Sequence, residues 1–391
     1  MFGSLFGKRS ASKNTRSLSP AGSGAAAAGV AAMPLPESMA DVNVAWLQHA
    51  VKDHPDFRGV RISGASGTPV GQGIGQMSAI ARYALTYDSA RGPESVVVKL
   101  HPPFEAMRAV GVRFEMYSRE SAFYQALAKE VAAPLPTIYF SEWEPTQQRS
   151  ATVMQDMTRW HWPDQLAGAT LQQAECCIDA IAQLGARHWG ADLSQHPWLP
   201  DTRAPVMQNM IHDYRLCVPV TLQRLASFVS PEARVACERI AQSMDWIFAE
   251  LARPPLVISH FDSRLENFVF VEPGSDKTAM IDWQLVARLR PGWDFSYFLG
   301  TSVPEDVRRQ WQPALAKRYL DGLRVGGVRD YDAARFNTDL RLNTMAMTLI
   351  PVIGGASFDG DNPRSVALFG AILQRSLGSV LDNDCLDLLP P

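Results

Sequence analysis

The sequence predicts an α+β fold with two lobes, a small β-rich N-terminal lobe with one key helix and a larger, mainly α-helical C-terminal lobe. Of the 391 residues 46% are hydrophobic, which is enough to build a core in more than one lobe. Strand-like segments concentrate before a polar and aromatic connector, QDMTRWHWPDQ, and helical patterns dominate after it. We therefore place the N-terminal lobe at residues 41–157 and the C-terminal lobe at residues 158–391.

The charge balance and the cysteines limit the class of partner. Basic and acidic residues number 37 and 40, for a formal net charge of -3. This balance argues against nucleic acid and against a membrane surface, and we expect small-molecule partners. Five cysteines without a C-x-x-C pair indicate neither a disulfide framework nor a zinc site. No apolar stretch approaches the roughly 20 residues that cross a bilayer, so we expect a cytoplasmic protein.

Residues 1–40 are rich in Ser, Ala and Gly and contain no acidic residue before Glu37. A segment of this composition cannot build a core. Its Arg and Ser content also permits a transit peptide, but the poor amphipathic periodicity favours a disordered tail.

The N-terminal lobe is expected to begin with a helix that starts near Val44, is capped by Asp41 and ends near Pro55. A glycine-rich turn and alternating apolar patterns then predict a β-rich stretch interrupted by one helix. The elements expected after the turn are strands at 80–87 and 95–100, a helix at about 115–129 and a strand at 151–154.

The C-terminal lobe carries stronger helix signals. Thr170 and Gln173 form a capping box, and Ser230 followed by Pro231 starts another helix. Apolar runs at 256–258 and 268–271 enclose a polar loop. The helices predicted in this lobe cover about residues 170–188, 231–253, 305–324, 331–350 and 363–382.

Three closely spaced glycines, Gly71, Gly73 and Gly75, open the β-rich stretch. Such glycines let backbone N–H groups approach phosphate oxygens, although a flexible hairpin turn explains them equally well. A dinucleotide-binding fingerprint is disfavoured, because position 76 is Gln and the run that follows alternates like a strand. The chain also lacks a Walker A loop, since its one Gly-Lys pair, at residues 7–8, has neither the upstream Gly nor the hydroxyl residue.

Lys99 lies inside the apolar strand SVVVKL, which is a costly place for an ammonium group unless it meets an anion. The alternative is a lysine at a strand end that extends into solvent. About twenty residues later, Glu120 follows on a predicted helix beside apolar Phe123. A strand lysine paired with a helix glutamate after a glycine hairpin is the arrangement that positions nucleotide phosphates in kinases.

The segment SHFDSRLENFVF places polar residues between two apolar runs. Asp262 can orient a hydroxyl group and accept its proton, and Asn267, five residues on, can offer an amide oxygen to Mg²⁺. Arg264 occupies the place where protein kinases put a lysine on the γ-phosphate. Asp282 ends a strand about fifteen residues after Asn267, where a second metal-binding group is needed.

Each of these residues also has an ordinary structural explanation. His260 can hydrogen-bond in the core, Glu266 can be a solvated charge in a turn, and Asp282 can cap the loop that follows it. Their joint occurrence with the glycines, in kinase order and spacing, favours phosphoryl transfer over coincidence.

With these motifs the chain resembles the aminoglycoside phosphotransferase and choline kinase superfamily, and most of all its ecdysteroid-kinase-like branch with bacterial relatives. The resemblance covers about residues 41–380. It is carried by GQGIG, VVVKL, RESAFYQAL and, more specifically, VMQDM, DQLAG, SHFDSRLENFVF, IDWQ and WDFSYFLG. It implies a bilobal protein-kinase-like fold, ATP and Mg²⁺ as cosubstrates, and phosphorylation of a small-molecule alcohol.

The resemblance also implies roles by motif position. Asp262 would be the catalytic base, with His260 and Arg264 beside it, and Asn267 and Asp282 would bind Mg²⁺. Asp294 would hold the catalytic loop or line the substrate side. The nucleotide site would comprise Gly71, Gly73, Gly75, the pair Lys99 and Glu120, and an adenine hinge from Gln155 to Met157.

Two departures from the family pattern stand out. Phe261 replaces the usual Gly between the His and the Asp, so we expect either a narrowed loop or a partly filled acceptor pocket. Gln284 stands where many relatives carry a second acidic residue, which predicts weaker binding of a second Mg²⁺.

The preferred hypothesis is thus an ATP- and Mg-dependent small-molecule kinase that moves the γ-phosphoryl group to an alcohol. The alternative is a non-catalytic nucleotide-binding or scaffold protein of the same fold, which Phe261 alone favours. A Rossmann-type oxidoreductase conflicts with the strand after the glycines. Trp160, His161 and Trp162, with Trp283 and Trp293, are weak candidates for contacts with an apolar acceptor.

Overall fold

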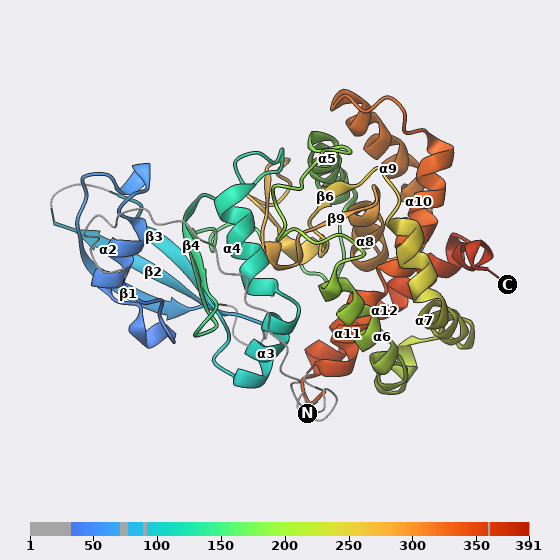
Figure 1. Ribbon diagram of the computed structural model, residues 1–391, viewed down its shortest axis with the longest axis horizontal. Coiled ribbons are helices and arrows are strands. Elements are labelled where there is room, and N and C mark those ends of the chain that lie inside the picture. The colour runs from blue at the N-terminus through green and yellow to red at the C-terminus, as the bar shows by residue number, and fades with distance from the viewer. Residues whose placement is uncertain (1–32, 71–76, 89–91, 359, 391) are drawn as a thin grey trace, which may run out of the picture.

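The computed structural model describes residues 33–70, 77–88, 92–358 and 360–390. An antiparallel sheet forms one end of the molecule and a larger helical body forms the other (Figure 1). Within the described residues, no helix combines the length and the apolar character that spanning a bilayer requires.

Five antiparallel strands form the sheet, in the order β1-β2-β3-β5-β4. The central strand, β3, is buried almost throughout, and its Val96 and Val98 pack with Trp46 and Leu47 of helix α2 (Val44–Val51) into one core. Lys99 of β3 lies opposite Ile80 on one side and Thr152 on the other. The strands are β1 (Ile62–Pro69), β2 (Ala79–Tyr87), β3 (Ser95–Leu100), β4 (Ile138–Glu144) and β5 (Arg149–Gln155).

Two helices, α3 (Glu105–Arg113) and α4 (Met116–Ala126), follow β3 and lie between the sheet and the helical body (Figure 1). Helix α4 contributes to both parts of the molecule. Its Phe123 and Tyr124 belong to the core of the helical body, together with Trp283. Its Glu120, by contrast, reaches Lys99 of the sheet.

The helical body encloses two small antiparallel pairs of strands. Strand β6 (Val257–Ser259) pairs with β9 (Ala287–Leu289), and β7 (Phe268–Phe270) pairs with β8 (Thr278–Met280). The polar loop at residues 260–267 therefore joins one pair to the other, and so does the segment at residues 281–286.

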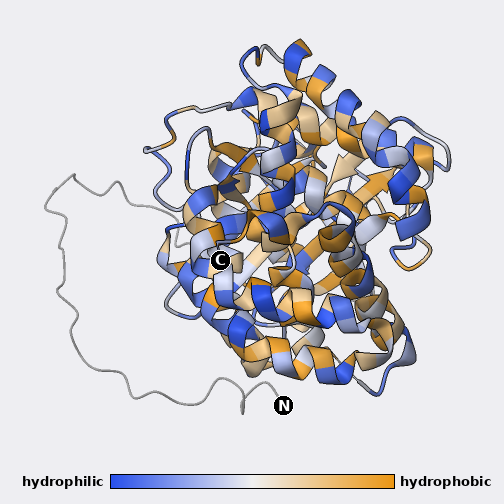
Figure 2. Ribbon diagram, turned by 90° about the vertical axis from the view of Figure 1, so that its right-hand side faces the viewer, coloured by the Kyte–Doolittle hydropathy of each residue, from blue (hydrophilic) through white to orange (hydrophobic). Residues whose placement is uncertain are grey.

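Most helices around these strands have a buried and an exposed side, and Figure 2 shows hydrophilic and hydrophobic residues interspersed along the helices. Helix α8 (Trp293–Ser302) is the exception, since all of its residues are buried. Buried aromatic and aliphatic side chains from the helices form two large clusters. The helices are α5 (Leu171–Arg187), α6 (Pro205–Arg224), α7 (Pro231–Leu251), α8 (Trp293–Ser302), α9 (Glu305–Val325), α10 (Ala333–Ala346), α11 (Leu349–Ser357) and α12 (Pro363–Asp382).

The strongest local signals in the sequence agree with the structure. Thr170 and Gln173 form the expected capping box of α5, and Ser230 caps α7. The cap of α2 is Asn43, whose side chain accepts from the Trp46 N–H, and the expectation for Asp41 was wrong. Asp41 lies too far before the helix and instead accepts hydrogen bonds from Ser38.

The helix expected at 331–350 is two helices, α10 and α11, and six strands and helices of the structure were not predicted. Strand β1 is made of small and polar residues and has no apolar alternation. Helix α6 contains an internal proline, Pro219, which hides its pattern. Strands β4 and β9 and helices α3 and α8 are the other four. The placement of the lobe boundary between residues 157 and 158 stays a prediction.

The carboxylate of Asp156, next to β5, makes the stability of the sheet depend on pH. Asp156 accepts from Ser95 Oγ at 2.5 Å and from Arg82 Nε at 2.6 Å, and so joins three strands. Burial would raise its pKa, but hydrogen bonds from Ser95 and Thr158, with Arg82, lower its pKa to about 2.

Because the pKa of Asp156 in the folded state lies below its usual value of 3.8, the carboxylate stabilises the fold above that pH. This contribution is lost as the pH falls from about 4 towards 2. We expect Asp156→Asn to lower the Tm near neutral pH and to flatten the loss of Tm below pH 4. Thermal unfolding of the wild type and of Asp156→Asn across this pH range measures both Tm values. Parallel curves of Tm against pH would contradict the stabilising role of the Asp156 carboxylate.

Candidate active site

Lys99 is the buried centre of a cluster of ion pairs, in which Glu120 is buried and Asp282 is partly exposed. Its Nζ lies 2.7 Å from Glu120 Oε1 of α4 and 2.8 Å from Asp282 Oδ1, beyond β8. The Lys99 side chain is only 9% exposed, so the ammonium does not extend into solvent as the alternative explanation required. The cluster joins the sheet, helix α4 and the segment after β8.

Burial disfavours the charged form of all three groups, and the opposite charges reverse this effect at two of them. At Lys99, burial lowers the pKa, but the Asp282 and Glu120 carboxylates outweigh it and the pKa is raised. Burial raises the pKa of Asp282, but the Lys99 ammonium prevails and the pKa is lowered. At Glu120 burial prevails over Lys99, and the pKa is raised. The cluster thus keeps the ammonium protonated, which is the form that binds phosphate oxygens.

Asp294, in the first turn of α8, holds the backbone of the polar loop. Its two carboxylate oxygens accept from the N–H groups of His260 and Phe261, each at 3.0 Å. Ser263 Oγ donates to the Asp294 carbonyl at 3.0 Å. These bonds fix the residues on both sides of Asp262, which agrees with the loop-holding role expected for Asp294.

His260 was expected in the catalytic set, but the structure places it beneath the loop. It is fully buried, does not line the cavity described below, and Nε2 lies 2.8 Å from the Ile281 carbonyl. Its ring also contacts the edge of Trp283. His260 therefore connects the loop to the segment that carries Asp282, and its place in the catalytic set stays a prediction.

Asp262 and Arg264 face the same cavity. Arg264 Nη1 lies 3.2 Å from Asp262 Oδ2, and Arg264 Nε lies 3.6 Å from Glu266 Oε2. Burial would lower the pKa of Arg264, but the neighbouring carboxylates, above all Asp262, raise it. The guanidinium is thus held beside the carboxylate that the sequence marked as the base.

Asn267 and Asp282 provide oxygen atoms suited to a hard cation. Asn267 Nδ2 donates to the Asp262 carbonyl at 2.6 Å, so the amide nitrogen is occupied in the loop. The Ile281 N–H donates to the Asn267 carbonyl at 3.0 Å, which brings the residue before Asp282 against Asn267.

Carboxylate and amide oxygens are the ligands that Mg²⁺ prefers, so this donor set fits the ion. Among the described residues, no group of three or more His, Cys, Asp or Glu side chains could hold a metal. The remaining ligands would be water and phosphate oxygens, as is usual for Mg²⁺.

The structure restricts how the expected hinge can contact a ligand. The Met157 carbonyl already accepts from the Trp160 N–H at 2.9 Å and from Trp162 Nε1 at 3.0 Å. The Gln155 N–H donates to the Thr137 carbonyl. Gly71, Gly73 and Gly75 lie outside the described residues. Gln284, two residues after Asp282, donates to Ser78 Oγ at 3.1 Å, and Ser78 follows closely after the undescribed residues 71–76.

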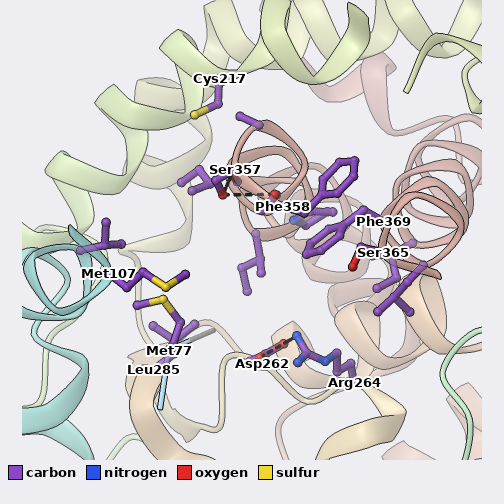
Figure 3. A pocket seen from close by; sticks show the side chains of 18 of the residues that line it. Met77, Met107, Cys217, Asp262, Arg264, Leu285, Ser357, Phe358, Ser365 and Phe369 are labelled. Atoms are coloured by element: carbon purple, nitrogen blue, oxygen red, sulfur yellow. Dashed lines mark hydrogen bonds and ion pairs between the residues drawn. The ribbon is translucent and has the colours of Figure 1, made fainter. Parts of the chain in front are cut away.

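A cavity of about 640 Å³ opens in front of these groups. Asp262, Arg264 and Asp282 lie on one wall of it. Figure 3 shows Asp262 and Arg264 facing Phe358 and Phe369 across the cavity, and these two rings stack 5.0 Å apart. The remaining apolar lining includes Met77, Met107, Met116, Met210, Ile353 and Leu368.

No sequence motif indicates this apolar wall. It comes from α3, α6, α11 and α12, which are far apart in the chain and carry no motif. None of the aromatic candidates of the sequence lines the cavity; Trp283 and Trp293 are fully buried in the core. The cluster of methionines around α3 was the one available signal, because methionine is common at adaptable apolar surfaces.

Phe261 does not fill the acceptor side of the loop. Its backbone has φ 76°, in the left-handed region where Gly is usual, and its side chain is fully buried. The ring stacks on Trp293 at 4.6 Å, and Trp293 Nε1 donates to the Phe261 carbonyl at 2.9 Å. The backbone of the loop is fixed here, because Asp294 accepts from the Phe261 N–H and Trp293 donates to the Phe261 carbonyl.

We expect Phe261→Gly to destabilise the protein although it relieves backbone strain. Strain at a left-handed non-glycine residue costs about 1–3 kcal/mol, whereas removing a buried phenyl ring costs about 3–5 kcal/mol. The net loss in the free energy of unfolding should be about 2 kcal/mol. Urea denaturation measures it. A more stable variant would show that strain, and not the packing of the ring on Trp293, dominates at this position.

Comparisons with known proteins support the fold. A choline kinase from Cryptosporidium parvum superposes with a TM-score of 0.50 at 10% identity, covering 82% of this chain and 89% of its own. An ethanolamine kinase from Plasmodium vivax gives 0.48 at 11% identity, covering 82% and 81%. A Streptomyces rimosus aminoglycoside phosphotransferase, in complex with ADP and streptomycin, gives 0.41 at 19% identity, covering 72% and 92%. No curated protein matches the chain.

The expected bilobal, kinase-like α+β fold is thus confirmed, and so is the resemblance to the phosphotransferase superfamily. The sequence model of the ecdysteroid kinase-like family matches residues 72–325, which include the Lys99 cluster and the polar loop. Since this match spans more than half of the protein, the chain belongs to the ecdysteroid kinase-like family.

Proposed function

We propose that the protein transfers the γ-phosphoryl group of ATP, with Mg²⁺, to a hydroxyl group of a small molecule with an apolar body. The observation that carries this proposal is the convergence of Asp262, Arg264 and Asp282 on one cavity, with the Lys99–Glu120 pair directly behind Asp282. An ammonium, a guanidinium and carboxylates at this spacing are the groups that phosphoryl transfer requires.

Each side chain has a defined part in the proposed reaction. Lys99 binds phosphate oxygens of the nucleotide and Glu120 orients it. Asp262 hydrogen-bonds the acceptor hydroxyl and takes its proton as the oxygen attacks the γ-phosphorus and the bond to ADP breaks. Arg264 gives up its contact with Asp262 and instead hydrogen-bonds the oxygens of the phosphoryl group that is transferred. Mg²⁺, held by Asn267 and Asp282, would neutralise phosphate charge.

The nucleotide would enter between the sheet and the helical body, in the lobe that we place at residues 41–157. With the Met157 carbonyl already engaged, the hinge offers the adenine ring the Met157 N–H and the backbone carbonyls before it. Gly71, Gly73 and Gly75, which lie outside the described residues, stay predicted contacts of the phosphates.

The acceptor is proposed to be an alcohol carried on an uncharged apolar body. The cavity wall opposite Asp262 includes stacked Phe358 and Phe369 with methionine and aliphatic neighbours. Four carboxylates also line the cavity, those of Asp262, Glu266, Asp282 and Asp361, and the first three lie beside Arg264 or Lys99. A polycationic amino sugar would gain little from the aromatic and methionine part of the wall, because its ammonium groups would lose water there. An apolar ring or chain would gain about 25 cal/mol for each Å² that it removes from water.

The alternative hypothesis, a non-catalytic scaffold protein, was favoured by Phe261 alone. The ring of Phe261 packs in the core and leaves the cavity to Asp262 and Arg264, so this residue no longer favours that alternative.

Paired substitutions of the two aspartates test the proposed chemistry. We expect Asp262→Asn to lower kcat by about 10²–10⁴, because the base is lost, while Mg·ATP still stabilises the protein against heat. Asp282→Asn should instead abolish the Mg-dependent part of that stabilisation, which is roughly 2.7 kcal/mol for ligand at 100 times Kd.

Thermal unfolding with ATP, Mg·ATP and NAD, followed by ADP release with a panel of alcohols, makes these measurements. A wild-type protein that no nucleotide stabilises would overturn the proposed function. A wild-type rate in Asp262→Asn would remove Asp262 as the base.

The cavity wall predicts acceptor preference. Phe369→Ala should raise the KM for an apolar ring alcohol about tenfold and leave the KM for ATP unchanged, because one buried apolar contact is worth about 1–3 kcal/mol. Phe104→Ala is the matched control, since Phe104 is 68% exposed and does not line the cavity. Steady-state kinetics with an apolar ring alcohol, a linear alcohol and a cationic amino sugar test it; faster turnover of the amino sugar would contradict the assignment of an apolar acceptor.

A further inference from the structure

Arg119 is a buried guanidinium at the junction of the sheet and the helical body. It precedes Glu120 on α4 and is 1% exposed. Its Nη1 donates to the Leu285 carbonyl at 3.2 Å and to the Val286 carbonyl at 3.4 Å, and its Nη2 donates to the Phe114 carbonyl at 2.5 Å. Leu285 and Val286 are the third and fourth residues after Asp282, so Arg119 connects helix α4 to the segment that carries this carboxylate.

A buried guanidinium without a carboxylate partner in contact is costly, because its charge loses hydration. The hydrogen-bond acceptors of Arg119 are backbone carbonyls, and burial lowers its pKa to about 10. The planar guanidinium has five N–H donors, which few side chains could replace at carbonyls on two separate elements. A methionine of similar length would leave those carbonyls without donors.

A second contact comes from the same face of α4. Phe123, four residues after Arg119, stacks on Trp283 with ring centroids 4.1 Å apart and planes 8° apart. Residues four apart on a helix are neighbours, so Arg119 and Phe123 contact the segment at 283–286 side by side. Asp282 itself has φ 66°, a conformation that must be held by its surroundings.

We propose that Arg119 is a positioning residue, which holds the segment after Asp282 against helix α4 so that Lys99, Glu120 and Asp282 are assembled before any ligand binds. Its meaning for catalysis rests on the proposed function. In protein kinases, the position of the corresponding helix is a means of control. Here α4 cannot leave the segment after Asp282 without breaking the bonds from Arg119 Nη1 to the Leu285 and Val286 carbonyls.

Hydrogen exchange on the ligand-free protein tests the proposal independently of any activity. We expect Arg119→Met to speed amide exchange about tenfold or more in two peptides, one covering residues 281–289 and one covering α4, because their connecting bonds are lost. Arg119→Lys, which keeps the charge and reaches fewer carbonyls, should show a smaller change in the same peptides, and it replaces the first variant if that one does not fold.

Arg375 of α12 provides the matched control. It is also buried, at 8% exposure, and it donates to the carbonyls of Gln165, Leu166 and Thr301. Arg375→Met should cost stability without selective exchange at residues 281–289. Equal, general acceleration in both variants, or no acceleration in Arg119→Met, would overturn the positioning role.

Titration with Mg·ADP separates this inference from the proposed function. In Arg119→Met the Mg²⁺ concentration for half-maximal ADP binding should rise about 10–100-fold, as when other residues that orient metal ligands are replaced. An unchanged Mg²⁺ requirement would contradict the inference even if the wild type binds Mg·ADP well. If the wild type binds no Mg·ADP, the proposed function fails, and the exchange data still decide the role of Arg119.

Discussion

The architecture depends on one buried ammonium group. Lys99 contacts carboxylates from two elements that are 21 and 183 residues away in the chain, Glu120 and Asp282. Removing one partner of such a cluster leaves an uncompensated charge in the interior, which is far more costly than the loss of a surface ion pair. The sheet, helix α4 and the segment after β8 therefore have one favourable relative arrangement, and that arrangement creates the candidate site.

The groups that face the cavity are held by a layer of polar residues that do not reach it. Asp294 accepts both loop N–H groups beside Asp262, His260 connects the loop to Ile281, and Arg119 connects α4 to Leu285. These buried polar side chains, and the left-handed backbone at Phe261 and Asp282, cost stability that the surrounding core must supply. The gain is a set of side chains whose positions are fixed before a ligand arrives, which reduces the cost of ordering them during binding.

The two sides of the cavity come from different parts of the chain. The residues proposed for phosphoryl transfer lie in a strand, a loop and one short segment, whereas the apolar wall that faces them comes mainly from helices α3, α6, α11 and α12. Such a division allows one set of phosphoryl-transfer residues to serve different acceptors when the helices change.

The sequence by itself determined the fold class, the core strand with Lys99, the capping box of α5 and the loop from His260 to Asn267, because each is encoded by neighbouring residues with a fixed spacing. It could not determine that His260 lies beneath the loop, that Phe261 turns its ring towards Trp293, or that Arg119 spans two elements. Those contacts join residues 21 to 166 positions apart, and local periodicity carries no information about direction across such separations. Only the tertiary structure decided which helices face Asp262, because the shape of a cavity is set by packing between elements and not by the pattern within any one of them.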